Sequence, residues 1–191
     1  GTASMLRTLP MTRHAPLTQR LVLIAFFTAL TILSAQVKLY FGSPVPVTLQ
    51  VLVVLLAGMV LGARDGALSQ FAYLGLLALN LPVDAAASGF GALTGATAGY
   101  LLSFAPAALV TGLLAERAGD RLLLRWASGL AGVAVIYVSG VIVLRAVTGM
   151  EWGAVWAAGV APFVLLDALK AVIAAGMSEG LRALIVRMPP L

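Results

Sequence analysis

The 191-residue chain contains no cysteine and a single histidine, His14. The missing cysteines exclude a disulfide, a thiolate metal site and a cysteine nucleophile, and one histidine excludes any site that needs two. Charge is scarce as well, because Asp, Glu, Lys and Arg make up 10% of the residues. The basic residues are scattered between apolar stretches, so the net charge of +5 does not indicate nucleic-acid binding.

Motifs for catalysis and nucleotide binding are also missing. The chain has no Gly-x-x-x-x-Gly-Lys-Ser/Thr phosphate loop, no His-Glu-x-x-His zinc helix and no Gly-x-Ser-x-Gly elbow. Asp167 is the one carboxylate deep in an apolar stretch, whereas a proton pump needs several. A transport role would need energy from another source or from a ligand gradient alone. A small intramembrane enzyme with Asp167 as acid or base is an alternative, but it would lack a second catalytic group.

Apolar residues dominate what is present. They form 61% of the chain, and the mean hydropathy is +1.05, which is typical of an integral membrane protein. A membrane-spanning helix needs about 20 mostly apolar residues. The sequence predicts an all-α polytopic membrane protein, with residues 17–191 as one domain of six transmembrane helices: Leu17–Val37, Val47–Ala63, Gly66–Leu81, Gly91–Ala115, Trp126–Thr148 and Pro162–Leu184.

The distribution of Lys and Arg predicts that both termini are cytoplasmic. With that orientation the outer segments hold Lys38 and Arg145, Lys170 lies within a span, and the inner segments hold all the others: Arg7, Arg13, Arg20, Arg64, Arg117, Arg121, Arg125, Arg182 and Arg187. Residues 1–16 are expected to be a cytoplasmic segment that begins with an expression-tag remnant, Gly1-Thr-Ala-Ser4. The outer loops, 38–46, 82–90 and 149–161, are rich in small residues and Pro, so they could fold down over a cavity or simply be tight connections.

Asp167 and Lys170 stand out in the last apolar stretch. Ionisable side chains at membrane depth cost about 2.5–3.5 kcal/mol each on insertion scales, so each is expected to have a partner or a purpose. Residues three apart share one face of a helix, and this pair is expected in the outer half of the membrane. The two side chains could be an acceptor and a donor for a small polar ligand, or an internal salt bridge.

Two more polar residues lie near the predicted outer side. Gln50 follows Pro44-Val-Pro-Val-Thr48 and could contact a ligand or satisfy carbonyls freed near the prolines. Asp84 lies in the second outer loop, where composition favours a solvated carboxylate over a ligand contact.

Small residues form two further patterns. Gly91, Gly95 and Gly99 recur at four-residue spacing, which favours close helix packing; the alternative is space for a flat ligand, with Thr97 and Tyr100 adding hydroxyls. Ala25 and Ala29 form a small-xxx-small pair in the first span that could contact another membrane helix.

Four stretches together resemble one known family. Pro44-Val-Pro-Val-Thr-Leu-Gln50, Leu61-Gly-Ala-Arg-Asp-Gly-Ala-Leu-Ser69, Gly95-Ala-Thr-Ala-Gly-Tyr-Leu-Leu-Ser-Phe104 and Asp167-Ala-Leu-Lys170 resemble the BioY family. These proteins are the biotin-specific S-components, or substrate-binding subunits, of energy-coupling-factor (ECF) vitamin transporters. The family pattern is Gly-Pro-Thr-Gly-Gly-Tyr, whereas this chain has Gly95-Ala-Thr-Ala-Gly-Tyr100. Ala96 and Ala98 therefore replace a proline and a glycine.

The resemblance implies a function and a set of partners. It implies capture of biotin from the outer side of a prokaryotic cell membrane, with no cofactor, by an S-component that works with a transmembrane coupling subunit and two ATPases. Asp167 and Lys170 would hold polar groups of biotin, and the segment from Gly89 to Tyr100 would line the pocket, with Asp84 only loosely aligned. The Ala25/Ala29 pair matches the pattern that meets the coupling subunit. An S-component for thiamine or riboflavin is the alternative within transport.

Overall fold

The computed structural model describes residues 10, 12, 15–119 and 121–187. The expected tag remnant, Gly1–Ser4, and His14 lie outside these residues. The described chain is mostly helical, and its elements follow one another in this order: α2 (Leu17–Gln36), β1 (Lys38–Leu39), β2 (Val47–Thr48), α3 (Gln50–Leu61), α4 (Ala63–Ala78), η1 (Gly89–Leu93), α5 (Ala98–Leu102), α6 (Phe104–Ala118), α7 (Leu122–Thr148), α8 (Trp152–Gly159) and α9 (Val164–Arg187).

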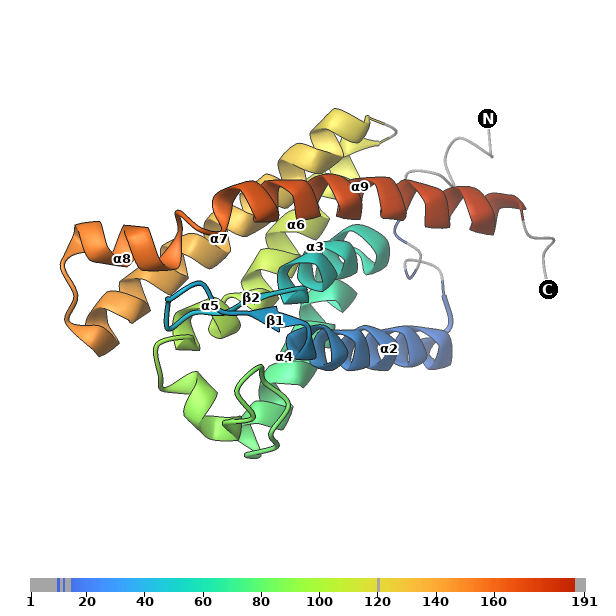
Figure 1. Ribbon diagram of the computed structural model, residues 1–191. Coiled ribbons are helices and arrows are strands. Elements are labelled where there is room, and N and C mark those ends of the chain that lie inside the picture. The colour runs from blue at the N-terminus through green and yellow to red at the C-terminus, as the bar shows by residue number, and fades with distance from the viewer. Residues whose placement is uncertain (1–9, 11, 13–14, 120, 188–191) are drawn as a thin grey trace.

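The helices form a bundle with two distinct ends (Figure 1). α2 begins and α9 ends at the right of the figure, whereas the β1–β2 hairpin and α8 lie towards the left. The two short strands are antiparallel, with Lys38 opposite Thr48 and Leu39 opposite Val47. The first predicted outer loop is therefore an ordered hairpin at one end of the bundle.

α3 is the central helix of the bundle. All but two of its residues are buried, and it packs against α2, α4, α6 and α9. At 12 residues it is about 18 Å long. Gly62 ends α3 with a φ of 84° and directly precedes α4, a backbone conformation that favours glycine.

Small residues let the inner helices approach closely. A Cβ atom added at Gly58 of α3 would lie 2.5 Å from the carbonyl oxygen of Ala108 in α6. One added at Gly112 of α6 would lie 2.4 Å from the backbone nitrogen of Ala63. In a membrane, where the hydrophobic effect between helices is weak, such close backbone contact is a main source of packing energy.

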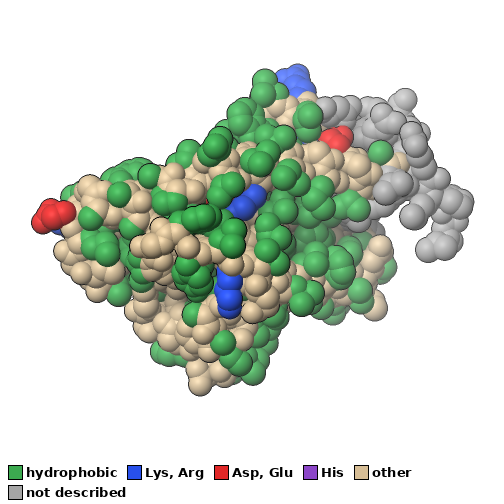
Figure 2. Space-filling view, viewed as in Figure 1, with side chains coloured by type: hydrophobic (Ala, Val, Ile, Leu, Met, Phe, Trp, Pro, Cys, Tyr) green, Lys and Arg blue, Asp and Glu red, His purple; other side chains and the backbone are tan. Residues whose placement is uncertain are grey.

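The side chains on the surface are those of a membrane protein. Hydrophobic side chains are spread over the described part of the face in Figure 2, and charged ones are few and isolated. Large apolar residues such as Phe26 on α2 and Val138 and Ile142 on α7 are more than half exposed. An apolar surface of this extent is stable in lipid and would aggregate in water.

The predicted spans agree with the helices in part. α2 and α7 lie where two spans were expected, and these are the two described helices long and apolar enough to cross a membrane by themselves. α8 and α9, bent by 43° at their junction, could form a third. The six crossings and the orientation therefore stay predictions.

Two expectations about continuity were wrong. The predicted span Gly91–Ala115 is broken into η1, α5 and α6, and Pro106 lies in the first turn of α6, where proline is tolerated. The predicted loop 149–161 contains α8, whose Val155 is fully buried. Both breaks bring short segments over the end of the bundle where the candidate site lies.

Candidate functional site

A partly open cavity of about 100 Å³ lies at the hairpin end of the bundle. Its roof consists of Tyr40 and residues 44–46 of the first predicted outer loop, the adjoining strand β2, and residues 84–86 of the second outer loop. Its walls come from α3, α5, α7, the start of α6 and α9. Two of the predicted outer loops thus fold over a cavity.

Asp167 and Lys170 both line this cavity. Lys170 Nζ donates a hydrogen bond to Asp167 Oδ1 at 2.7 Å, and the two residues are 8% and 3% exposed. Asp167 lies in the first turn of α9, where the positive end of the helix dipole also stabilises a carboxylate. The two alternatives for this pair are not exclusive, since it is an internal salt bridge and also faces a cavity.

Tyr137 of α7 completes this cluster, and the sequence analysis missed it. Its hydroxyl donates a hydrogen bond to Asp167 Oδ2 at 2.7 Å, and the residue lines the same cavity. The available signal was its place in the middle of an apolar span, because a phenol hydroxyl needs a partner away from water. The cluster therefore joins α7 to α9 at the wall of the cavity.

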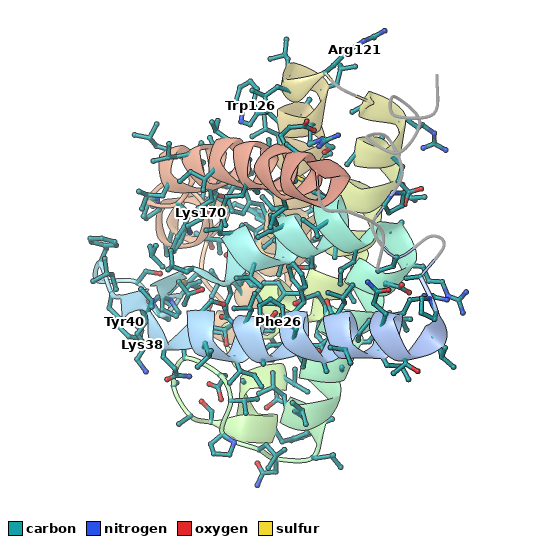
Figure 3. All side chains as sticks on the ribbon, turned by 90° about the vertical axis from the view of Figure 1, so that its right-hand side faces the viewer. Phe26, Lys38, Tyr40, Arg121, Trp126 and Lys170 are labelled. Carbon is teal, nitrogen blue, oxygen red and sulfur yellow. The ribbon has the colours of Figure 1, made fainter. Side chains whose placement is uncertain are left out.

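The roof is tied to the rest of the molecule by two side chains. Lys38 Nζ donates to the carbonyl oxygen of Ala85, which joins the two outer loops. Ser43 Oγ donates to the carbonyl oxygen of Ala158 in α8 at 2.7 Å. Figure 3 shows Lys38 and Tyr40 together at the end of α2 that leads into the hairpin.

Gln50 lies at the start of α3 and lines the cavity. Its Nε2 donates to the hydroxyl of Tyr73 at 3.0 Å, and Thr48 Oγ1 donates to its Oε1 at 3.3 Å. The amide is thus held by side chains instead of by carbonyls near the prolines. Its predicted contact with a ligand stays a prediction that its position favours.

The prediction that Asp84 is solvated was wrong. Composition favoured a solvated carboxylate, but Asp84 is 4% exposed and lines the roof of the cavity. Its carboxylate accepts hydrogen bonds from the backbone N–H groups of Ala86 and Gly89 and from Ser88 Oγ. Short polar side chains often hold turns in this way. Asp84 shapes the loop, and Gly89 is part of the same turn.

In the small-residue segment, residues 89–100, some residues line the cavity and others pack against a neighbouring helix. Thr97 and Tyr100 line the cavity, and the Tyr100 hydroxyl donates to the carbonyl oxygen of Gly159 at 3.0 Å. Gly99 instead contacts α7, where a Cβ atom would lie 2.4 Å from the carbonyl oxygen of Ser139. Gly89 and Gly91 are not among the residues that line the cavity. A ligand contact of Gly89, Gly91 or Gly99 stays a prediction.

Ala25 and Ala29 are exposed on α2, as is Phe26, which Figure 3 labels on this helix. The opposite face of α2 is attached to α4: Arg20 forms an ion pair with Asp65 at 2.6 Å, and Thr28 Oγ1 donates to the carbonyl oxygen of Ser69. The exposed face is therefore carried by a helix that is fixed to the bundle.

The donor set of the cavity suits an organic ligand. Within residues 15–119 and 121–187, with Pro10 and Thr12, no group of three or more His, Asp or Glu residues is placed to hold a metal ion. The cavity presents a carboxylate, an ammonium group, an amide and hydroxyls among apolar walls. This combination is typical of a site for a small molecule with a few polar groups.

Comparisons with known proteins agree with each other. Residues 5–187 match the model of the BioY family. The chain is 41% identical over 170 residues to the biotin transporter BioY of Thermotoga maritima, an alignment that covers 87% of this chain and 97% of that protein. It is 39% identical over 161 residues to the probable biotin transporter BioY of Pyrococcus horikoshii, covering 84% and 94%.

A solved structure shares the fold. The crystal structure of the S-component for biotin from an ECF-type ABC transporter superposes on this chain with a TM-score of 0.81. The match covers 87% of this chain and 92% of that one, at 24% sequence identity. The helical arrangement described above is thus the fold of that S-component.

Proposed function

This chain belongs to the BioY family, and on that premise we propose that it is the biotin-binding membrane subunit of an ECF-type uptake transporter. The observation that carries the proposal is the Asp167–Lys170 pair, which is buried and yet faces a cavity roofed by the two outer loops. The family's matched relatives are named biotin transporters. The alternatives, an S-component for another vitamin and an enzyme, have no such support.

The polar groups of the site are complementary to biotin. The ureido ring of biotin offers two N–H donors and one carbonyl acceptor. A buried carboxylate accepts from N–H groups, and an ammonium group donates to a carbonyl oxygen, in charge-assisted hydrogen bonds that are stronger than neutral ones. Asp167 and Lys170 supply one group of each kind on adjacent turns of α9.

The proposal also includes the membrane in which the chain lies and its orientation there. The chain crosses the plasma membrane of a prokaryote six times, with the cavity opening to the outside and both termini in the cytoplasm. Two facts support this orientation: the excess of Arg in the predicted inner segments, and the location of the cavity at the end of the bundle opposite the start of α2 and the end of α9 (Figure 1).

The direct test is equilibrium binding of labelled biotin to the purified protein in detergent. Saturable binding of one biotin per chain is expected, with no displacement by excess thiamine or riboflavin. Displacement by either vitamin would support that vitamin as the ligand instead. If intact, folded protein shows no saturable binding of biotin, the proposal is wrong.

Partner proteins are the proposed source of energy for transport. The chain has no phosphate loop, so we propose that a transmembrane coupling subunit with two ATPases drives release of biotin to the inside. The exposed face of α2 with Ala25 and Ala29 would contact the coupling subunit, because small side chains permit close contact between helix backbones.

Replacing both alanines by tryptophan, Ala25→Trp with Ala29→Trp, is expected to abolish co-purification of the coupling subunit and to leave biotin affinity unchanged. The bulky rings would hold the two helices apart without reaching the cavity. The matched control is Val138→Trp with Ile142→Trp, two exposed residues at the same spacing on α7. Co-purification that persists in the alanine variant, or is lost equally in the control, would contradict this docking face.

A further inference from the structure

A hydrogen bond between helices links Tyr137 to the proposed ligand site. Tyr137 Oη donates to Asp167 Oδ2, while Lys170 Nζ donates to the other oxygen, Oδ1, each at 2.7 Å. Each carboxylate oxygen therefore accepts a hydrogen bond, one from Tyr137 on α7 and the other from Lys170 on the same helix as Asp167. We infer that Tyr137 is a positioning residue, which holds the Asp167 carboxylate so that its remaining lone pairs face the N–H groups of the ligand.

The hydroxyl restricts a motion that Lys170 alone would permit. The terminal torsion of an aspartate side chain is broad, so a carboxylate with one partner can rotate about its last bond. Such a rotation would change the direction in which the free lone pairs of both Asp167 oxygens point. With Tyr137 on Oδ2, that rotation breaks a hydrogen bond in surroundings where water is scarce to replace it.

The position of Tyr137 is itself well fixed. Its ring packs against both hydrophobic clusters of the bundle, the one around Tyr100 and Phe104 and the one around Met59 and Ala171. A tyrosine has two side-chain torsions, so holding it in place costs little entropy. The phenol therefore provides a rigid donor at the cavity wall.

A second aromatic side chain of α7 holds the same turn of α9. Trp126 Nε1 donates to the carbonyl oxygen of Ala168, the residue after Asp167, at 3.2 Å. Figure 3 shows Trp126 beside α9, with Lys170 on the same helix. The turn that carries the acid and the base is thus attached to α7 through its backbone and through its carboxylate.

This arrangement favours a ligand that donates hydrogen bonds to Asp167. The ion pair is neutral as a whole, and in the part of the chain that the structure describes Lys170 donates to Asp167 and keeps two further N–H groups. A polar but uncharged group with both donors and an acceptor, such as a cyclic urea, matches these groups. The inference rests on the proposed function, since it assigns the ureido ring of biotin to this cluster.

The test compares two ligands on the variant Tyr137→Phe, which removes the hydroxyl and keeps the ring. The ligands are biotin and a biotin methylated on a ureido nitrogen, which has lost an N–H donor. For the unmodified protein, biotin is expected to bind more tightly than the methylated analogue. In Tyr137→Phe the affinity for biotin is expected to fall about tenfold and that for the analogue much less, so that the preference shrinks.

A purely structural role of Tyr137 would lower both affinities by the same factor and leave the preference unchanged, and that result would overturn the inference. The matched control is Ser139→Ala, which removes a hydroxyl from the same helix; that hydroxyl donates to the carbonyl oxygen of Gly99. The control is expected to keep the full preference for biotin. A failure of the unmodified protein to bind biotin would instead refute the proposed function, and this inference with it.

Discussion

Lys170→Met should lower the affinity for biotin by a factor of 100 or more and also lower the melting temperature in detergent. The substitution keeps an unbranched, flexible side chain that is one atom shorter, but leaves the Asp167 carboxylate buried without its cationic partner. Removing one partner of a buried ion pair costs about 3–5 kcal/mol, because the other charge stays uncompensated. Equilibrium binding of labelled biotin and thermal unfolding, measured on the same preparation, would give the two effects separately.

A double variant distinguishes the fold from the site. Asp167→Asn with Lys170→Met removes both charges, so the melting temperature should recover most of the loss, whereas biotin affinity should stay low. Buried ion pairs can often be replaced by neutral groups without loss of stability. Recovery of tight biotin binding in the double variant would show that the pair is structural only, and undiminished binding in Lys170→Met would refute the site.

Gly112→Ala should be among the most destabilising single-methyl additions in the chain. The new Cβ atom would lie 2.4 Å from the backbone nitrogen and 2.5 Å from the Cα of Ala63, so α6 has to move away from the start of α4. Overpacking of this kind costs about 1–3 kcal/mol, and contact with backbone leaves little room for relief. The expected result is a marked fall in melting temperature in detergent.

Gly75→Ala is the matched control, with the opposite expected sign. Gly75 lies within α4, and among the described residues no atom outside its own helix lies within 4 Å of an added Cβ atom. Alanine favours a helix over glycine by up to about 1 kcal/mol, so the melting temperature should stay the same or rise slightly. Equal losses in the two variants would contradict this prediction, because they would show that the close contact between α6 and α4 does not determine the result.

The helices that lie against lipid were the easiest to predict from sequence. α2 and α7 begin and end within a few residues of the expected bounds, because a long apolar run bordered by polar or turn-forming residues can form little else in a membrane. The break between α5 and α6 was missed because the residues on both sides of it are almost all apolar. Pro106 was the available sign, since proline fits the first turn of a helix and not its interior.

The candidate site was predictable where it depends on charge and not where it depends on tertiary contact. Asp167 and Lys170 could be found because buried charges are expensive, and their three-residue spacing puts them on one helix face. The partner that Tyr137 finds depends on how α7 crosses α9, which apolar periodicity does not encode. The burial of Asp84 depends on a turn that folds inward, and a polar residue between two spans gives no sign of that.

α3 has a consequence for how the protein responds to its membrane. At about 18 Å it is far shorter than the roughly 30 Å hydrocarbon layer, yet neighbouring helices cover nearly all of its surface. A lipid can impose hydrophobic mismatch only on a helix that it touches. A thicker or thinner bilayer should therefore change the tilt of α2 and α7. The short length of α3 should not affect how the protein responds. Because α3 carries Gln50 into the cavity, this part of the ligand site should be insulated from the lipid composition, whereas Tyr137, which lies on α7, should follow a tilt of that helix.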